Sequence, residues 1–407
     1  MQRKQGIMMT KNILRNEQYS TMGLKVINRA FAIDISQSKL TAAKGELVVN
    51  QDKSTVYVKE IREFNYDNEG IEELIKFLGE YKEGIIEATG IYYFHLHERL
   101  TEKGYKVTVI NPLHLTEMLG KKTDKLDAQR LLVAHMTGVI KGSYIPTGEI
   151  KELRELTRYR ESLVEKITQV KNEIRKILEI AGYKIQPFDK KGRQLLEKLA
   201  KGEGLNKEEK DELKERLGRN LNDAEKLALK QLVELLKSLE NMVKEVEDMI
   251  ISKIPQPVIE LSKIPGVGLI SAATIYAEFG DVSRFSSSKA ARAYAGFAPK
   301  TKQSGENESH SGMIRGNKYL RRILYLVARV ARNLEPFNGY YERLIARGKS
   351  ATQATCALAG KLASICYHVI KDGVYKGVVK KRFRVPRGKE VNVKDFNVGD
   401  ALDSLSP

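Results

Sequence analysis

Four carboxylates in the first third of the chain have the types and spacing of a divalent-metal nuclease site. Asp34 and Glu87 each close a short apolar run, and Asp124 and Asp127 are three residues apart, so on a helix they share one face. Phosphoryl transfer needs such oxygen ligands, which gather Mg²⁺ ions, activate an attacking hydroxyl and stabilise the leaving one. We therefore predict a metal site formed by these four residues, with Mg²⁺ as the expected ion and Mn²⁺ as an alternative.

Each of these carboxylates also has an ordinary structural interpretation. Asp34 could end a strand at a turn, and Glu87 could be a cap or a surface charge. Asp124 could cap a helix, with Asp127 complementing the helix dipole. For any one acid alone the ordinary interpretation is better, whereas the joint pattern favours a metal site. Three cations beside the last pair could hold phosphate: Lys121, Lys122 and Lys125.

The composition indicates a basic protein with several domains. The chain has 407 residues, and 70 Lys and Arg against 52 Asp and Glu give a formal net charge of +18. That length suffices for two or three domains. The positive excess is spread through every segment, which favours an extended surface for a polyanion. Together with the carboxylates, this charge makes nucleic acid the expected partner.

The cysteine content and hydropathy favour a cytoplasmic protein. Cys356 and Cys366 are ten residues apart, which fits neither a metal motif nor a disulfide framework. No apolar run reaches membrane-spanning length, so no membrane association is expected. Residues 1–24 have no convincing signal-peptide pattern and are expected to be a basic extension.

Residues 25–145 alternate between strand and helix patterns. Period-two alternation predicts three opening strands, at Lys25–Asp34, Lys39–Val49 and Thr55–Phe64. Three strands followed by strand–helix alternation is the order of the ribonuclease H-like (RuvC-like) fold, which by analogy clusters acids at strand ends. The later elements are predicted as helix Ile71–Tyr81, strand Ile85–Glu87, helix Tyr92–Lys103, strand Lys106–Ile110 and a helix from Lys125 to about Val139.

Residues 146–253 carry two seven-residue apolar repeats joined by a polar connection, 186–225. They predict an antiparallel helical hairpin or a dimerising coiled coil, with an intramolecular bundle as an equal alternative, because the repeats are short and Arg160 falls at a core position. The repeats are Leu156, Leu163, Val170 and Ile177, then Leu229, Leu236, Val243 and Ile250.

Residues 254–375 are expected to form a mainly helical domain, followed by a tail, 376–407. Its opening segment, Ile264-Pro-Gly-Val-Gly268, resembles a helix-hairpin-helix motif. In that motif, the turn that contains Gly266 and Gly268 points backbone N–H groups at a phosphate. The alternative is an ordinary glycine-containing turn. Nearby cations favour DNA-backbone binding: Lys263 before the turn and Arg284, Lys289 and Arg292 after it.

A third group surrounds Ser304, which we expect in a flexible, glycine-flanked loop. Its hydroxyl could attack a phosphodiester if a base or metal took its proton. From the residues alone, a polar loop serine is the better interpretation. Ser309 and Ser311 are rivals, His310 could be a base, and Tyr319 is expected to pack. The surrounding cations are Lys300, Lys302, Arg315, Lys318, Arg321 and Arg322.

Taken together and in this order, the motifs resemble one family of insertion-sequence transposases (insertion-sequence family 110), close to the pilin-gene invertases. That family pairs an N-terminal DEDD domain with a C-terminal serine domain, and the resemblance runs from about residue 28 to 372. The motifs are Ala32-Ile-Asp34-Ile-Ser, Ile86-Glu87-Ala-Thr-Gly90, Lys122-Thr-Asp124-Lys-Leu-Asp127-Ala, Ile264-Pro-Gly-Val-Gly268, Gly296-Phe-Ala-Pro299, Gln303-Ser304-Gly305 and Arg315-Gly-Asn-Lys-Tyr-Leu-Arg321.

The resemblance implies more than the residues alone. By it, Asp34, Glu87, Asp124 and Asp127 match the Mg²⁺-binding tetrad, and Ser304 matches the serine that links covalently to DNA. It also implies a structured guide RNA, and a homodimer that completes the site and assembles into a tetramer on DNA. The chain departs from the family at residues 1–24, in the acidic stretch after Ser304, and in the long 186–225 connection.

We therefore expect a DNA recombinase that uses a metal and a serine. The first alternative is a Holliday-junction resolvase or nuclease that uses metal-activated water, with Ser304 structural. The second is a non-catalytic nucleic-acid-binding protein. An actin-like sugar kinase also places an Asp after an apolar strand, but the Ile-Ser-Gln-Ser that follows Asp34 lacks the glycines of that fold.

Overall fold

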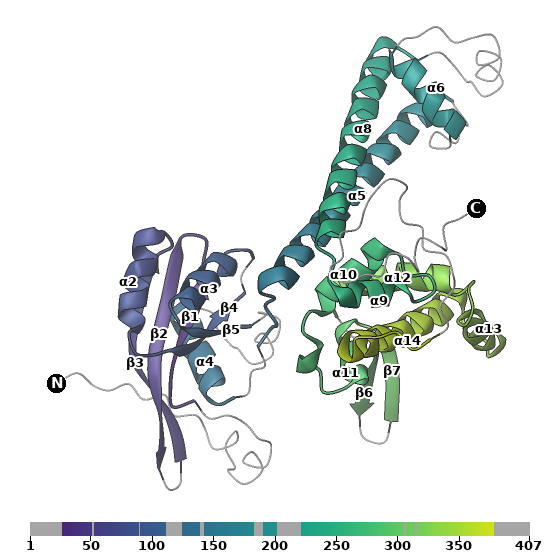
Figure 1. The fold of residues 1–407 in the computed structure, drawn as a ribbon. Coiled ribbons are helices and arrows are strands. Elements are labelled where there is room, and N and C mark those ends of the chain that lie inside the picture. Colours follow the sequence, from purple (N-terminus) through teal and green to yellow (C-terminus); the bar gives the residue numbers. More distant parts are fainter. Residues whose placement is uncertain are drawn as a thin grey trace. The chain divides into compact units, whose positions relative to one another are not determined.

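The chain is seen here in a computed structural model, which describes residues 27–50, 53–88, 90–110, 124–138, 142–182, 190–201, 221–304, 307–313 and 316–377. It divides into two compact units, one ending at Ile145 and the other beginning at Pro146 (Figure 1). None of the helices in these described ranges is both long and apolar enough to cross a membrane.

Unit 1 is built on a five-stranded mixed sheet with the order β3-β2-β1-β4-β5. Strand β2 runs antiparallel to both of its neighbours, β1 and β3, and β4 and β5 continue the sheet in parallel with β1. This confirms the predicted α/β unit, and the succession along the chain, three strands followed by strand–helix alternation, is the one expected of a ribonuclease H-like domain. The strands are β1 (Arg29–Ile35), β2 (Lys39–Asn50), β3 (Lys53–Asn65), β4 (Glu83–Glu87) and β5 (Lys106–Ile110).

Helices cover both faces of this sheet, and β1 presents apolar side chains to both of them, large ones to one face and alanines to the other. Phe31 and Ile33 point to the face covered by α2 (Asn68–Leu78) and α3 (Tyr93–Glu102). Ala30 and Ala32 point to the opposite face, where α4 (Asp124–Met136) packs Ala128, Leu131 and Leu132 against the sheet. The small alanines leave room for α4 to lie close to the strands.

Unit 2 begins with two long antiparallel helices, α5 (Gly148–Ile180) and α8 (Asp223–Ser252). Ion pairs between them show the antiparallel arrangement. Glu152, near the start of α5, pairs with Lys253 at the end of α8, and Lys171, further along α5, pairs with Glu240, which comes earlier in α8. A shorter helix, α6 (Lys190–Lys201), lies in the segment predicted as a polar connection and packs against α8. The structure therefore shows an antiparallel helical hairpin within one chain, and a dimerising role for it stays a prediction.

The buried face of this hairpin differs from the predicted seven-residue seam. Leu163 and Val170 are buried as expected, but Leu156 and Ile177 are only partly buried. Arg160 is not a core residue, because its guanidinium lies at the edge of the helix pair and binds Glu247 at 2.6 Å. Ile174, also part of the predicted apolar pattern, is fully buried, and a straight α-helix drifts away from a strict seven-residue repeat, so Leu178 is buried in place of its neighbour Ile177.

The rest of unit 2 is mainly helical, as the sequence predicts. Its elements are α9 (Gln256–Ser262), α10 (Leu269–Phe279), the short η2 (Val282–Arg284), α11 (Ser288–Tyr294), β6 (Pro299–Ser304), β7 (Asn307–Met313), α12 (Lys318–Ala331), α13 (Asn338–Ala346) and α14 (Ala351–Asp372). The segment around Ser304 is a two-stranded antiparallel hairpin, rather than the predicted flexible loop. Its polar sequence lacks the apolar alternation that would have identified strands. The predicted tail from residue 378 onward lies outside the described residues.

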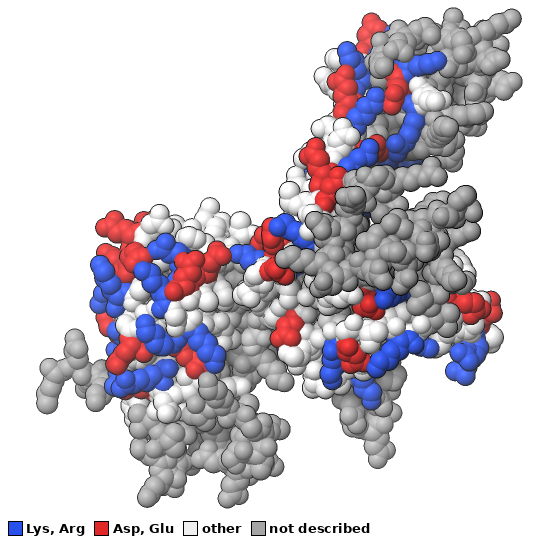
Figure 2. Space-filling view, in the orientation of Figure 1, with Lys and Arg blue, Asp and Glu red and all other residues white. Residues whose placement is uncertain are grey.

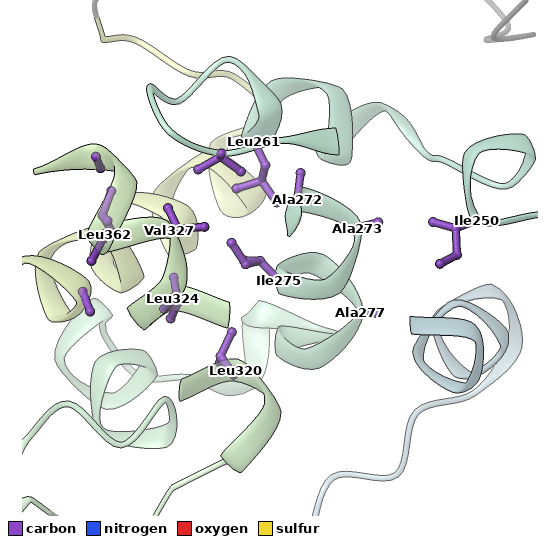
Figure 3. Packing of buried hydrophobic residues seen from close by; sticks show 14 of the residues in the cluster. Ile250, Leu261, Ala272, Ala273, Ile275, Ala277, Leu320, Leu324, Val327 and Leu362 are labelled. Carbon is purple, nitrogen blue, oxygen red and sulfur yellow. The ribbon is translucent and has the colours of Figure 1, made fainter. Parts of the chain in front are cut away.

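Helix α10 lies at the centre of the unit 2 core. Its alanines Ala272, Ala273 and Ala277 are small, so α12, α14 and the end of α8 can approach it closely (Figure 3). Leu320, Leu324 and Val327 of α12 and Leu362 of α14 fill the space around Ile275 (Figure 3). The helical hairpin and the C-terminal helices thus share one hydrophobic core.

Candidate active site and nucleic-acid interface

Asp34 and Glu87 occupy matching positions on neighbouring parallel strands. In β1 and β4, Ile33 lies opposite Ile86, and the two carboxylates follow directly after this pair. Neighbouring strands lie about 4.8 Å apart. Both acids are half-buried, and by alternation both face the side of the sheet that α4 covers. The sheet therefore brings together two residues that are 53 positions apart in sequence.

Helix α4 carries the other predicted pair onto the same face. The helix begins at Asp124, so Asp124 and Asp127 both lie in its first turn. Ala128, next to Asp127, is fully buried against the sheet. The side chain of Asp124 lies outside the described residues. The first turn of α4, which contains Asp124 and Asp127, thus belongs to the helix that covers the face of the sheet to which Asp34 and Glu87 point.

The side chain of Asp127 has a feature that fits a bound cation. It is 17% exposed, and its Oδ1 atom is buried with no hydrogen-bond partner among the described residues. Arg130 Nη1 lies 3.5 Å from this oxygen without forming a hydrogen bond. A buried carboxylate oxygen without a donor is costly unless a cation or water binds it. Among the described side chains, no three potential ligands lie close enough to hold a metal ion.

Ser304 is the last residue of β6 and pairs with Asn307 of β7, across the turn of the hairpin. It therefore sits at the tip, where the strands turn. The side chains of Ser304, Ser309, His310 and Ser311 lie outside the described residues, so the choice of nucleophile stays a prediction.

The base of this hairpin is closely packed. Gly296 has φ +77°, and a Cβ atom there would overlap the Arg321 guanidinium at 2.3 Å. Gly316 abuts the Gly296 backbone, because a Cβ at residue 316 would lie 2.4 Å from the Gly296 nitrogen. Arg321 also donates from Nη2 to the Gly296 carbonyl at 3.2 Å. Arg321, predicted to bind nucleic acid, therefore helps to hold the hairpin base.

The Gly-Val-Gly turn joins α9 to α10. Gly266 has φ +89°, and a Cβ atom there would lie 3.1 Å from Ala331 of α12, so this glycine is required by the turn and its packing. Gly268 is the N-cap of α10, where an added Cβ would meet open space. It has no side chain to cap the first N–H groups of α10, which leaves room for an anionic acceptor.

Two of the predicted DNA-binding cations already have carboxylate partners in unit 2. Lys263 binds Glu260 at 2.6 Å, one turn before it. Arg322 forms ion pairs with Glu161 and Glu165 of α5. Burial alone would lower the pKa of Arg322, but these two carboxylates outweigh it and raise the pKa. Their contribution to DNA binding stays a prediction.

The cations near α10 and α11 differ in role. Arg284 donates from Nη2 to the Phe279 carbonyl at 3.1 Å, and its guanidinium stacks on Phe285 and Tyr294. It is thus part of the packing, whereas Lys289 is exposed and Arg292 half-buried.

The predicted site residues next to the Ser304 hairpin are partly described. Lys318 is exposed, and its ammonium lies 4.8 Å from the ring centre of Tyr319, which is half-buried. Lys121, Lys122 and Arg315 lie outside the described residues, as do the side chains of Lys125, Lys300 and Lys302.

The described surface carries mixed charge on the face shown. Lys and Arg are interspersed with Asp and Glu on both units, with no large patch of one sign among the described residues of this face (Figure 2).

Comparison with known proteins decides the family. A model described as a transposase, DEDD_Tnp_IS110, matches residues 31–182, which contain all four predicted carboxylates. A second, described as the transposase IS116/IS110/IS902 family, matches residues 259–342, which contain Ser304. This chain belongs to the IS110 family of transposases. It is therefore an enzyme that cuts and rejoins DNA, as the sequence predicts.

Relatives of this transposase support the assignment. An uncharacterized 43.6 kDa protein of insertion element IS110 from Streptomyces coelicolor is 35% identical over 32% of each chain. The transposase of insertion sequence element IS1111A from Coxiella burnetii is 26% identical over 68% of this chain and 74% of its own. A pilin gene-inverting protein from Moraxella bovis is 28% identical over 71% of this chain and 80% of its own.

Sequence reasoning missed one group of residues in this transposase. Glu278 is fully buried in α10 and binds Arg158 of α5 and Asn317, which precedes α12. The only signal was a charged residue inside the apolar run Tyr276-Ala-Glu-Phe279. Its partners are 120 and 39 residues away, so spacing could not identify them.

Proposed function

We propose that this transposase is a site-specific DNA recombinase that uses a divalent-metal carboxylate site and a serine nucleophile. The observation that carries the metal half is the placement of Asp34 and Glu87 at matching positions on β1 and β4, on the face of the sheet that α4 covers. The buried Oδ1 of Asp127 supports it. Asp34, Glu87, Asp124 and Asp127 would hold Mg²⁺, or Mn²⁺ in its place.

The proposed chemistry is two successive transesterifications. When bound, the metal would make a coordinated hydroxyl more acidic and offset the charge of the phosphate. The Ser304 oxygen forms a bond to the phosphorus of a DNA phosphodiester, and the bond from phosphorus to one DNA oxygen breaks, releasing a DNA hydroxyl. After strand exchange, a DNA hydroxyl attacks the phosphoserine and restores the serine. The number of phosphodiester bonds is conserved, so no external energy source is needed.

The proposed assembly has nucleic acid and protein partners. DNA is the substrate, and a structured RNA would guide donor and target recognition and occupy part of the basic surface. A homodimer, and a tetramer on DNA, would bring the carboxylates and Ser304 together. These partners rest on the family and on the net charge of +18.

The test is a covalent adduct between protein and DNA. Cells carrying the gene within its native flanking DNA would be lysed in SDS, and protein–DNA adducts isolated and mapped by mass spectrometry. We expect a DNA-linked peptide at Ser304 in the wild type and none in Ser304→Ala or Asp34→Ala. Ser309→Ala and Glu73→Gln, an exposed α2 residue, are the matched controls and should keep the adduct.

Two outcomes would overturn this proposal. Recombined DNA without an adduct, unaffected by Ser304→Ala, would mean that metal-activated water does the cutting. DNA binding without strand chemistry in cells that hold the complete element would favour a binding protein.

A further inference from the structure

Glu278 is a buried carboxylate with three strong hydrogen bonds. Arg158 donates to both of its oxygens, from Nε at 2.6 Å and from Nη2 at 2.9 Å. Asn317 donates from Nδ2 at 2.7 Å. An unpaired carboxylate at 0% exposure would be very costly, so these donors determine how Glu278 is held. The forked contact with Arg158 also fixes its orientation.

A second arginine of α5 binds the same turn of α10. Arg154 donates from Nε to the Ala277 carbonyl at 2.8 Å and from Nη2 to the Glu278 carbonyl at 3.0 Å. Arg154 and Arg158 are four residues apart, so they project from one face of α5. Cations at the C-terminal end of a helix are favourable because carbonyl groups point outward there. Helix α5 is therefore joined to the end of α10 by polar contacts as well as by the shared core.

Burial of Arg158 would by itself lower its pKa, but the hydrogen bonds and charge of Glu278 outweigh this and raise the pKa. The guanidinium also lies 4.3 Å from the ring centre of Tyr319, in the first turn of α12. Arg158 thus contacts α10 and α12 at once.

Asn317 links Glu278 to the start of α12, shortly after the end of the Ser304 hairpin. Its Oδ1 accepts from the N–H groups of Tyr319 and Leu320 and so caps α12. Its Nδ2 donates to Glu278 and to the Tyr294 hydroxyl, and its own N–H donates to the Tyr294 carbonyl at 2.8 Å. The polar groups of its side chain are all used, and Asn317 lies four residues after Met313, the end of β7.

The segment that precedes β6 is held by the same group of residues. Gly296, three residues before β6, packs against Gly316 and receives the Arg321 hydrogen bond described above. Tyr294 ends α11 two residues earlier, and it accepts from Asn317. One polar cluster, which consists of Glu278, Arg158, Asn317 and Tyr294, therefore includes a residue shortly before the start of β6 and a residue shortly after the end of β7.

We propose that Glu278 is a positioning residue for the serine hairpin: with Arg158 and Asn317 it fixes where β7 ends and α12 begins, and thereby where Ser304 is presented. The inference rests on the proposed function, since it matters for catalysis only if Ser304 is the nucleophile. A misplacement of about 1 Å can cost on the order of 100-fold in rate, so loosening the hairpin base would slow the adduct-forming step without touching the reacting atoms.

The experiment uses the full chain in the adduct assay above, with three variants. Glu278→Gln keeps the shape but turns an oxygen that accepts from Arg158 and Asn317 into a donor. Asn317→Ser keeps a good cap for α12 and removes the donor to Glu278. The double variant Glu278→Gln/Asn317→Asp exchanges donor and acceptor between positions 278 and 317 and restores that contact, while the new amide at position 278 still faces the Arg158 donor. Glu247→Gln, which breaks an arginine ion pair elsewhere in unit 2, is the matched control.

We expect Ser304 adduct formation to fall on the order of 100-fold in both single variants, to recover in part in the double variant, and to stay at the wild-type level in the control. DNA binding should change less than about threefold in all of them, because the phosphate contacts remain. Hydrogen exchange should become faster at Pro299–Met313 in the single variants, while α14 keeps its protection.

The outcomes separate this inference from the proposed function. Wild-type adduct levels in folded Asn317→Ser and Glu278→Gln would overturn the positioning role, as would loss of protection throughout unit 2, which would indicate a general stabilising role. If the wild type itself forms no adduct at Ser304, the proposed function is wrong. If hydrogen exchange at the hairpin is unchanged in the single variants, the positioning role of Glu278 is wrong, whatever the nucleophile is.

Discussion

Asp127 has one carboxylate oxygen in a position that is unfavourable for stability alone. Leaving a buried acceptor without a donor costs about 1–3 kcal/mol. Oδ1 of Asp127 is such an acceptor within the described residues, although Asp127 lies in the first turn of α4 and the next residue, Ala128, is part of the core. Functional sites often retain residues that stability alone would not select. The same side chain would therefore be stabilised by a divalent cation.

This predicts a metal-dependent melting temperature. Mg²⁺ at 100 times its dissociation constant would stabilise the wild type by about 2.7 kcal/mol, because it binds only the folded state. Asp127→Asn should lose the Mg²⁺ response, because it removes the charge that would bind the ion. Differential scanning calorimetry with and without Mg²⁺ measures both effects.

Glu73→Gln on α2 is the control for this measurement and should respond to Mg²⁺ as the wild type does. A full Mg²⁺ shift in Asp127→Asn would show that the ion binds elsewhere.

At the level of elements, the helices and strands that could be predicted from the sequence are the ones with a regular apolar pattern. Strands β1, β2 and β3 follow a period of two, and α5 and α8 follow a helical repeat. The Ser304 hairpin was missed because its strands, Pro299–Ser304 and Asn307–Met313, are almost entirely polar. Strand ends pointed to Asp34 and Glu87, but the partners of Glu278 depend on tertiary packing, which no local pattern encodes.

The turn between α9 and α10 allows its two glycines to be separated experimentally. Gly266→Ala should destabilise the protein by about 1–3 kcal/mol, because residue 266 has a positive φ and its new Cβ would press on Ala331. Gly268→Ala should change stability by less than about 1 kcal/mol, because its φ is −82° and the space is open. Urea unfolding followed by circular dichroism measures both.

The second variant also tests the predicted DNA contact. Gly268→Ala keeps the backbone N–H groups of α10, so DNA binding should persist. Equal stability of the two variants would contradict the packing role assigned to Gly266.

At the level of the whole molecule, the large positive net charge contrasts with the mixture of both signs on the described surface. The net charge is +18, yet the described surface in Figure 2 mixes both signs. A large total charge still attracts a polyanion over several ångströms at low salt, whereas mixed neighbours limit each local contact.

Binding to duplex DNA should therefore weaken steeply with salt. Each phosphate contact gives a slope of about −0.9 in log K against log salt, because counterions are released. We expect at least a 100-fold loss between about 50 and 200 mM NaCl, measured by fluorescence anisotropy. Circular dichroism at each salt concentration excludes unfolding as the cause. A flat response would mean that the basic residues do not carry the interaction.

The contact between Arg158 and Glu278 limits how relatives of this transposase can be combined into chimeras. Arg158 lies within the first family match, 31–182, and Glu278 within the second, 259–342. A crossover between the two matched regions would combine the residue at position 158 from one parent with the residue at position 278, and its surroundings, from the other. A crossover before Gly148, where α5 begins, would keep both partners from one parent. The unit of exchange is therefore set by side-chain complementarity, and it begins at the first residue of α5.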